Sequence, residues 1–352
     1  MLMKVAGIGG GHILEHRHLP VLKKLEDVEV TAVCDIQESV AKRVSKEFNV
    51  PKYYTNFAEM LKKEDLDFVD ICTPPKTHLS LAIEAMESGV HVLAEKPLGM
   101  TVDEVEQMYA VAKKQNVRLC AVHQNLYNPA FMKAKELVDS GEVGDIINVE
   151  VGTYCQKTNA VVKNGTHWAH KLPGGIAFEL LPHPLYILQV FIKNSKPKCL
   201  ITKKTGDLSW LKTDDTRVLM DGEKSSGLIV VNVNSPYHGD NLNIYGTKMY
   251  LMVDLWGRSI IKYKPKTEDP ISVGKANLNL AAQSLGVLGT TVSNSLTMGL
   301  SGIKVSAHYG FIEAFVNALK NGTEMPVSEA DAKENVDLVQ KICEMIDSEI
   351  KL

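Results

Sequence analysis

The residues of this chain with the clearest chemical potential stand where its apolar segments end. The first segment ends in the run Gly7-Ile8-Gly9-Gly10-Gly11-His12. Glycines in such a place allow a tight turn and let backbone N–H groups approach a phosphate at the start of the next helix. Two registers of the G-x-G-x-x-G pattern are possible, with His12 or Leu14 in the third glycine position. The run indicates a dinucleotide site, with an ordinary glycine-rich turn as the alternative.

An acidic residue follows at the position where such a site needs one. Asp35 ends the second apolar segment, and its carboxylate there can accept hydrogen bonds from the hydroxyls of the adenosine ribose. A carboxylate repels a 2′-phosphate, and the following residues 36–40 contain no Arg or Lys. NAD is therefore favoured over NADP as the cofactor. The alternative is that Asp35 only caps the helix that follows it.

A parallel sheet is the element that would position these residues. In the first third of the chain, short apolar runs rich in β-branched residues alternate with segments of helical spacing. The predicted strands are Lys4–Ile8, Val28–Cys34, Phe68–Cys72, His91–Ala94 and Val117–Val122, and the predicted helices are Glu38–Phe48, Leu79–Ser88 and Val102–Gln115. This alternation predicts an α/β fold with a doubly wound parallel sheet, a Rossmann domain over residues 1–124.

The pattern changes after residue 125, where short strands follow one another. The predicted strands are Asp145–Thr153, Leu200–Thr205, Thr216–Asp221, Gly227–Val233, Leu242–Tyr245, Met249–Leu255 and Ser259–Tyr263, and the helices are Pro184–Phe191, Tyr309–Leu319 and Ala330–Ile346. We expect a second α/β domain over residues 125–352, with a large open, mostly antiparallel sheet covered by helices on one face. The uncharged stretch 276–303 could be a lid, a subunit contact or a connection.

Composition excludes several classes of partner. The 352 residues are 45% apolar and 23% charged, and 39 basic residues nearly balance 42 acidic ones. This balance gives no electrostatic reason to expect nucleic acid or an anionic membrane. The six cysteines include no C-x-x-C pair and stand mostly in apolar contexts, as reduced thiols in a cytoplasmic protein do. We see no export signal and no segment apolar enough to span a membrane.

Several motifs give the chain a family resemblance. They are His18-Leu19-Pro20, Thr73-Pro74-Pro75-Lys76-Thr77-His78, Glu95-Lys96-Pro97, Gly174-Gly175 before Glu179 and His183, Gly246-Thr247-Lys248, and the ending from Phe315 through Pro326-Val327. With the glycine run, they resemble the glucose–fructose oxidoreductase/inositol dehydrogenase (Gfo/Idh/MocA) family over essentially the whole chain. The most specific element is Glu95-Lys96-Pro97.

The resemblance implies an NAD(P)-dependent oxidoreductase that acts on a secondary hydroxyl of a sugar, cyclic polyol or carbohydrate derivative. The cofactor-binding residues it implies are Gly9, Gly11, His12, Ile13, Asp35, Thr73, Pro74, His78, Glu95 and Lys96. In the family the lysine, here Lys96, contacts substrate and nicotinamide ribose. A carboxylate and a histidine, here Glu179 and His183, bind substrate and accept its proton.

These three residue types suit alcohol oxidation. A hydride must leave carbon while the hydroxyl loses its proton, and a neutral imidazole such as that of His183 can accept this proton near neutral pH. The ammonium of Lys96 would favour the developing alkoxide. On a helix, Glu179 and His183 would share a face, so the carboxylate could orient the ring or bind a neighbouring hydroxyl.

Departures from the family pattern lie on the substrate side. Glu179 stands where Asp is usual, Leu181 replaces a common glycine, and Leu126 stands where an arginine often precedes the aromatic residue. Pro182 and Pro184 flank His183, so we expect a bent helix start there. The cofactor side has no such changes. We therefore expect hydride chemistry on an unusual substrate.

Other residues could line the substrate pocket. Tyr127, His167 and Trp168 fall in stretches that do so in the family, and Trp168 offers an apolar face to a sugar ring. Because His167 and His170 have no nearby carboxylate or cysteine to complete a ligand set, we expect no metal site. Further pocket candidates are Tyr237-His238-Gly239-Asp240 and His308-Tyr309.

The expected partner is a small carbohydrate-like molecule, and the expected assembly is a homodimer or homotetramer. The open sheet face, expected to carry Val149, Val151, Ile229 and Val231, would be buried between subunits. Two functional alternatives remain. One is an enzyme that retains NAD and uses transient oxidation for elimination or glycoside cleavage. The other is a non-catalytic dinucleotide-sensing regulator, which would need neither Lys96 nor His183.

Overall fold

The computed structural model describes residues 2–265, 268–300 and 306–350 of the chain. These form two compact units: residues 1–124 with 303–337 (unit 1), and residues 125–302 with 338–352 (unit 2). The sequence-based division places everything after residue 124 in one domain, whereas the described residues 306–337 belong to unit 1. The contact between Phe315 and Phe68 contributes to this packing. The Phe315 side chain is fully buried, and its ring lies edge-on to that of Phe68, with ring centroids 5.4 Å apart.

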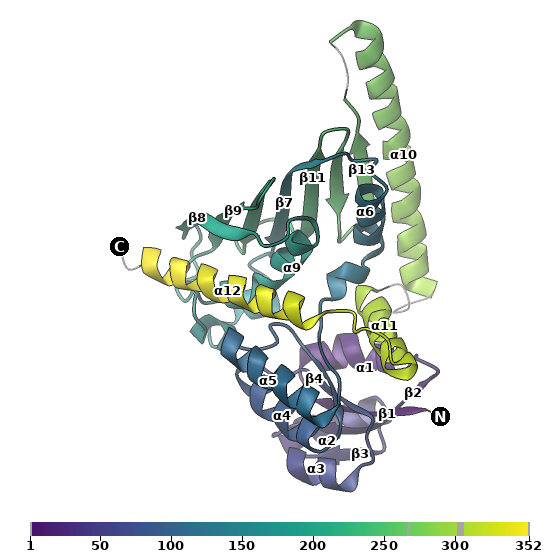
Figure 1. Ribbon diagram of the computed structural model, residues 1–352, viewed down its shortest axis with the longest axis vertical. Helices are drawn as coiled ribbons and strands as arrows, with labels where there is room; N and C mark the ends of the chain where they lie inside the picture. The colour runs from purple at the N-terminus through teal and green to yellow at the C-terminus, as the bar shows by residue number, and fades with distance from the viewer. Residues whose placement is uncertain (1, 266–267, 301–305, 351–352) are drawn as a thin grey trace. The chain divides into compact units, whose positions relative to one another are not determined.

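The described strands of unit 1 form a parallel sheet of order β3-β2-β1-β4-β5-β6 (Figure 1). The strands are β1 (Met3–Ile8), β2 (Val28–Cys34), β3 (Lys52–Tyr54), β4 (Phe68–Ile71), β5 (His91–Ala94) and β6 (Leu119–Ala121). This is the doubly wound order of a Rossmann domain. The predicted parallel sheet is therefore confirmed. The short strand β3, exposed along most of its length, was missed because it has no apolar period.

Helical segments connect these strands. They are η1 (Leu14–His18), α1 (Leu19–Leu22), α2 (Glu38–Glu47), α3 (Phe57–Lys63), η2 (Pro75–Thr77), α4 (His78–Glu87), α5 (Val102–Gln115), α11 (Ala307–Asn321) and the first part of α12 (Glu329–Glu349). Local sequence explains their ends. Thr101 caps α5 by accepting the Glu104 N–H at 3.2 Å, and Asn116 ends the helix in the left-handed conformation.

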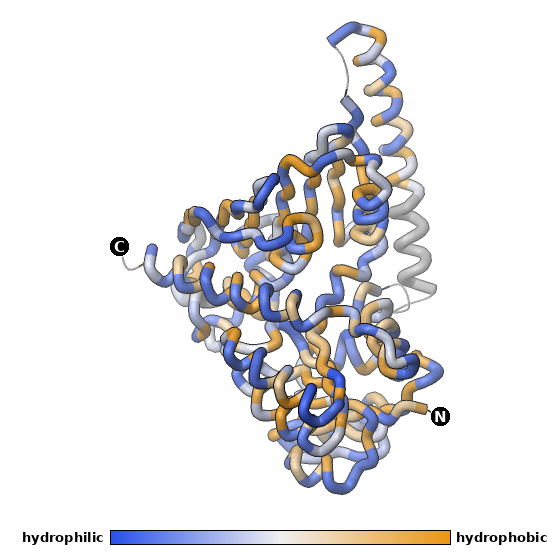
Figure 2. The backbone as a smooth tube through the Cα atoms, viewed as in Figure 1, coloured by the Kyte–Doolittle hydropathy of each residue, from blue (hydrophilic) through white to orange (hydrophobic). Residues whose placement is uncertain are grey.

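The described strands of unit 2 form a second sheet of order β13-β12-β11-β7-β10-β9-β8. The strands are β7 (Ile146–Tyr154), β8 (Lys196–Lys203), β9 (Asp215–Asp221), β10 (Ser226–Asn232), β11 (Gly239–Gly246), β12 (Tyr250–Asp254) and β13 (Ser259–Tyr263). All these pairings are antiparallel except that between β7 and β10. The expected mostly antiparallel sheet is confirmed. In Figure 2, apolar residues recur along the strands of this sheet.

The helical segments of unit 2 include those that cover one face of its sheet. The segments are η3 (Gln124–Tyr127, from residue 125), α6 (Pro129–Asp139), α7 (Ala160–Lys163), η4 (Trp168–Lys171), α8 (Ala177–Leu180), α9 (Pro182–Phe191) and α10 (Pro270–Leu300). Helix α9 contacts β7 and β10, and α6 contacts β12 and β13.

The expectation about the open face is wrong in its residues. Val149, Val151, Ile229 and Val231 are at most 3% exposed, because they lie on the face that α9 covers. The opposite face carries residues such as Leu219, which is 43% exposed, and Met252, which is 38% exposed. Tyr245, Tyr250 and Tyr263 stack across this opposite face, with centroid distances of 4.5 and 5.1 Å.

Residues 276–300 of the uncharged stretch belong to the long helix α10, which runs beside the edge strand β13 (Figure 1), and residues 301–303 lie outside the described residues. Gln283 on this helix serves the edge: its amide nitrogen donates to the Lys262 carbonyl at 3.0 Å, and its amide oxygen accepts the Lys262 N–H at 2.8 Å. Both backbone polar groups of Lys262 are thereby paired, which leaves them unavailable to a further strand. No helix among the described residues is both long and apolar enough to cross a membrane.

Candidate active site

The candidate cofactor residues of unit 1 meet at the carboxyl edge of the parallel sheet. Gly9 follows the end of β1, Thr73 follows the end of β4, and Glu95 and Lys96 follow the end of β5. The strand order reverses between β1 and β4, and open α/β sheets bind ligands outside the carboxyl ends of strands at such a point.

Gly9 is the glycine that the turn requires most. Its φ is +85°, and a Cβ there would lie 2.7 Å from the Thr73 Cγ2 atom and 3.0 Å from the Cys72 carbonyl oxygen. A Cβ at Gly7 would lie 2.8 Å from the side chain of Leu14, whereas a Cβ at Gly11 would meet no atom within 4 Å. The geometry thus favours the register that begins at Gly7 and Gly9, with His12 in the third position.

The Asp35 carboxylate stabilises the same glycine turn by hydrogen bonds. It accepts the Gly10 N–H at Oδ2 and the Gln37 N–H at Oδ1, each at 2.8 Å. Helix α2 has Gln37 as its N-cap residue, with no side-chain cap. The carboxylate of Asp35 therefore forms the turn before the helix and does not cap the helix itself.

The helical turn after Gly11 carries His12 and Ile13. The ring of His12 is exposed and stacks on the ring of His16, with centroids 4.3 Å apart. Partial burial and the charges of His16 and Arg17 lower the pKa of His12. The first backbone N–H groups of a helix have no partner within the helix, and an anion is favoured beside them.

His78 joins two of the loops at the carboxyl edge. Its ring is fully buried, with Nε2 2.8 Å from the Thr73 carbonyl oxygen and Nδ1 3.1 Å from the Pro97 carbonyl oxygen. Burial lowers its pKa, although the surrounding carbonyls oppose this. The ring thus holds the Thr73-Pro74 loop beside the residues that follow Lys96.

Lys96 is 9% exposed, and its neighbour Glu95 is engaged on both carboxylate oxygens. Oε1 of Glu95 lies 3.0 Å from His18 Nε2, and Oε2 accepts the Lys96 backbone N–H at 3.0 Å. His18 Nδ1 in turn lies 2.8 Å from Asp70 Oδ2. Burial would raise the pKa of Glu95, but the hydrogen bond and charge of His18 and the charge of Lys96 lower it to about 2.

His183 lies in unit 2, in the first turn of α9. Its Nδ1 atom is 2.9 Å from the hydroxyl oxygen of Tyr186, and that oxygen also accepts the Asn125 N–H at 3.3 Å. Asn125 donates from its side chain to Asp240, and Thr153 donates to the other oxygen of the same carboxylate at 2.7 Å. A chain of polar contacts therefore leads from His183 to the covered face of the sheet.

The backbone explains how prolines can flank His183. Helix α8 ends at Leu180, Leu181 keeps helical angles, and Pro182 begins α9 as its first residue. Both prolines fall in the first turn, where no helical N–H bond is lost. The helix is interrupted at Leu181 alone, between α8 and α9. Glu179 on α8 is half-buried, with Oε2 inaccessible to solvent.

The remaining substrate candidates stand on short turns of unit 2. Tyr127 is half-buried at the end of η3. His167 is the N-cap residue of η4 and accepts the Ala169 N–H at Nδ1, 3.3 Å away, with its ring centroid 5.0 Å from that of Trp168. His170 directs Nε2 to the Val161 carbonyl oxygen at 3.0 Å, so this atom carries a proton and is not available to a metal.

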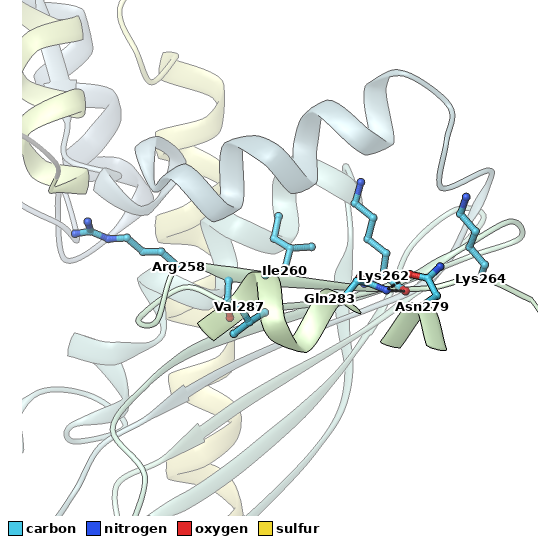
Figure 3. Close-up of a pocket in the computed structure, with 9 residues that line it drawn as sticks. Arg258, Ile260, Lys262, Lys264, Asn279, Gln283 and Val287 are labelled. Carbon is cyan, nitrogen blue, oxygen red and sulfur yellow. Dashed lines mark hydrogen bonds between the residues drawn. The ribbon is translucent and has the colours of Figure 1, made fainter. Parts of the chain in front are cut away.

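Two features of the structure lie outside the predicted set. Among the described residues, the groups with metal-ligand spacing both include His18, with Asp70 and Cys72 or with Glu95 and His308. Unit 2 holds a cavity of about 490 Å³ between β13 and α10, lined by Arg258, Lys262 and Gln283 among others (Figure 3). None of the candidate site residues lines this cavity.

Sequence reasoning missed Tyr186, Asp70 and the bonds of His18. Tyr186 follows His183 by three residues, a helical spacing that places both on one face. Asp70 interrupts an apolar strand, and a carboxylate inside such a strand must be paired. These two signals could have found them.

The residues at the edge of unit 1 fit a dinucleotide. Gly9 leaves a cradle that a Cβ would fill, the space beside Gly11 is open, and a helical N-terminus follows. The comparisons with known proteins agree. Residues 3–123 match the model described as "Oxidoreductase family, NAD-binding Rossmann fold", and residues 131–252 match the GFO/IDH/MocA C-terminal domain.

Individual relatives match parts of the chain. Oxidoreductase P35 of Formosa agariphila is 27% identical over 186 residues, which are 51% of this chain and 58% of that protein. Myo-inositol 2-dehydrogenase of Thermotoga maritima is 30% identical over 142 residues, 40% of this chain and 42% of that protein. The matched part thus spans less than two thirds of the length of these curated relatives.

A solved structure matches the whole fold. It is scyllo-inositol dehydrogenase from Lactobacillus casei with bound NAD(H) and scyllo-inositol, with a TM-score of 0.75 and 18% identity over 99% of this chain and 98% of that one. At this identity the match concerns the fold. The two matched domain models cover more than half of the residues, and the chain therefore belongs to the Gfo/Idh/MocA family of oxidoreductases.

Proposed function

We propose that this protein is an NAD-dependent oxidoreductase that transfers a hydride between the nicotinamide and a secondary hydroxyl of a sugar, cyclic polyol or related carbohydrate derivative. Family membership and the inositol dehydrogenases among its relatives support this proposal. The observation that carries it is the bond between His183 Nδ1 and the Tyr186 hydroxyl, because it fixes the ring of the residue proposed to take the proton.

The proposed proton acceptor is Nε2 of His183. When Nδ1 carries the ring proton and donates to the Tyr186 oxygen, Nε2 keeps a lone pair. A substrate hydroxyl placed beside Nε2 can then pass its proton to the ring as the C–H bond breaks. Bound NAD supplies the hydride acceptor.

Lys96 and Glu179 have supporting roles in this proposal. The Lys96 ammonium lowers the energy of the developing alkoxide and helps to place the hydroxyl. Glu179 would accept a hydrogen bond from a neighbouring substrate hydroxyl, and Trp168, His167 and Tyr127 would contact the sugar ring. Thr73, Pro74 and His78 would shape the nicotinamide end of the cofactor site.

The experiment that tests this function is a panel of sugars and polyols incubated with NAD and followed by the near-ultraviolet absorbance of NADH. We expect one chemical class of substrate to produce NADH. Substrate consumed while NAD stays bound and no NADH accumulates would instead support transient oxidation. NAD binding without turnover of any substrate would support a sensing role.

Cofactor preference gives a separate prediction about Asp35. Asp35→Asn removes the charge and should weaken the binding of NAD. The ratio of NAD to NADP affinity should shift toward NADP by about 10–100-fold, which corresponds to the free energy of one or two hydrogen bonds to a charged group. Asn keeps an oxygen for the Gly10 N–H, so the turn survives better than in Asp35→Ala. Isothermal titration with both dinucleotides measures the ratio. An unchanged ratio would mean that Asp35 serves only the turn.

The open sheet face gives a prediction about assembly. Leu219, Met252 and the stacked tyrosines 245, 250 and 263 lie on the face opposite α9, and exposed apolar side chains of this kind mark interaction surfaces. We expect a homodimer or homotetramer that buries this face. Light scattering at micromolar concentration should report at least twice the chain mass, and Met252→Lys should lower it. A monomeric mass for the unaltered protein would refute this assembly.

A further inference from the structure

A buried cluster of ionisable side chains lies next to Lys96 in unit 1. The side chains of His18 and Asp70 are 0% exposed, and that of Glu95 is 9% exposed. They come from different elements: His18 from η1, Asp70 from β4, and Glu95 from the residues after β5. Such a cluster is costly to bury unless its charges are matched.

The hydrogen-bond geometry defines the protonation of His18. Nδ1 lies 2.8 and 3.0 Å from the two oxygens of Asp70, and Nε2 lies 3.0 Å from Oε1 of Glu95. An ionised carboxylate can only accept hydrogen bonds. With both carboxylates ionised, both ring nitrogens carry protons, which makes His18 an imidazolium between two carboxylates.

The groups around the ring are consistent with this assignment. Burial opposes the cation, but Asp70 together with the Cys72 side chain outweighs burial and raises the pKa of His18 well above its usual value. Burial raises the pKa of the Cys72 thiol and lowers that of His308 to about 3, so both are neutral. When Lys96 is included, the cations of His18 and Lys96 balance the carboxylates of Asp70 and Glu95. The exposed side chain of Arg17 also acts on His308 and lowers its pKa.

Glu95 links this cluster to the chemistry. One of its oxygens faces His18, and the other accepts the backbone N–H of Lys96 at 3.0 Å. We propose that His18 is a positioning residue, which as a buried cation held by Asp70 fixes the Glu95 carboxylate and through it the placement of Lys96. The proposal rests on the proposed function insofar as it assigns Lys96 to the reaction.

The location of His18 adds a consequence. It is the last residue of the helical segment η1 (Leu14–His18), which follows the glycine turn by two residues. A displacement of this segment would therefore move the His18 ring, and with it the Glu95 carboxylate and Lys96. His18 couples the cofactor turn to the proposed catalytic lysine.

The first test reads His18 directly and needs no substrate. In protein labelled with ¹⁵N-histidine, long-range ¹H–¹⁵N spectra at pH 8 should show that both ring nitrogens of His18 are protonated, with its signal assigned by comparison with the His18→Gln variant. His18→Gln should remove this signal. If that variant does not fold, Asp70→Asn serves instead and should lower the pH at which the His18 ring loses a proton. A neutral ring at His18 would overturn the proposal. So would a stoichiometric metal bound to His18 in the purified protein, because the same groups have ligand spacing.

The second test asks whether His18 acts through Lys96. We expect His18→Gln to lower kcat by about 10–100-fold, as a small displacement of a catalytic group does, while the Kd of NAD changes by less than about threefold. In a Lys96→Ala background the same change should have little further effect. Losses that multiply in the double variant would overturn the proposal.

A matched control separates this effect from general damage to the fold. His91 is half-buried at the other end of β5, where its Nδ1 accepts the Arg118 N–H at 2.9 Å. His91→Gln should leave kcat unchanged, and a loss equal to that of His18→Gln would overturn the proposal. If the unaltered protein transfers no hydride to any substrate, the proposed function fails, and the NMR test still decides the state of His18.

Discussion

We expect His183→Ala to lower turnover by about 10²–10⁴-fold, the usual contribution of a positioned general base, with NAD affinity close to that of the unaltered protein. The imidazole would touch the reacting hydroxyl and not the adenosine half of the cofactor. Steady-state kinetics with a substrate from the panel, together with titration of NAD, measure both quantities.

The pH profile and a conservative variant sharpen this prediction. Oxidation should rise with pH as the imidazole loses its proton, and this acid limb should vanish in His183→Ala. Tyr186→Phe removes only the hydroxyl that holds Nδ1 and should cost less than His183→Ala while keeping the acid limb. Near-normal turnover of His183→Ala with an unchanged profile would show that the histidine is structural. Lys96, Glu179, Tyr127 and His167 would then be the next candidates.

Lys96→Ala should also lower turnover, by about 10²-fold or more, since an ammonium next to a developing alkoxide is an electrostatic contribution of that size. Unlike His183→Ala, it should weaken substrate binding as well. The double variant Lys96→Ala/His183→Ala should lose far less than the product of the single losses, because both residues serve one proton transfer.

Lys62→Ala provides the control for removal of a lysine from unit 1. Lys62 is an exposed residue of α3, and we expect its replacement to leave both kcat and KM unchanged. If the loss of turnover in the double variant equals the product of the losses in Lys96→Ala and His183→Ala, the two residues do not serve the same proton transfer.

Much of unit 1 could be predicted from the sequence because its signals are local. Apolar runs bounded by turns located β1, β2, β4 and β5 within one or two residues, and the glycine run lies at the end of β1 as expected. The register of the glycines could not be settled in this way. It depends on Cys72 and Thr73, which approach Gly9 only in the folded sheet.

Unit 2 shows where pattern reasoning reaches its limit. Strand β10 has apolar residues on both faces, Leu228 and Val230 on one and Ile229 and Val231 on the other. Alternation predicts that the two sets face opposite ways, but not which set α9 covers. The cluster around His18 could not be predicted either, because Asp70 and Glu95 lie 52 and 77 residues from His18 in the sequence and meet it only in the folded chain.

The most direct test of the proposed chemistry is a deuterium transfer measurement. A substrate from the panel, carrying deuterium at the carbon of its secondary hydroxyl, is incubated with the protein and NAD, and the reduced nicotinamide is analysed by mass spectrometry. Direct hydride transfer predicts one deuterium in the nicotinamide ring for each substrate oxidised, and a much slower transfer in His183→Ala. Oxidised product formed without deuterium in the nicotinamide, or with deuterium released to water, would contradict the proposed function.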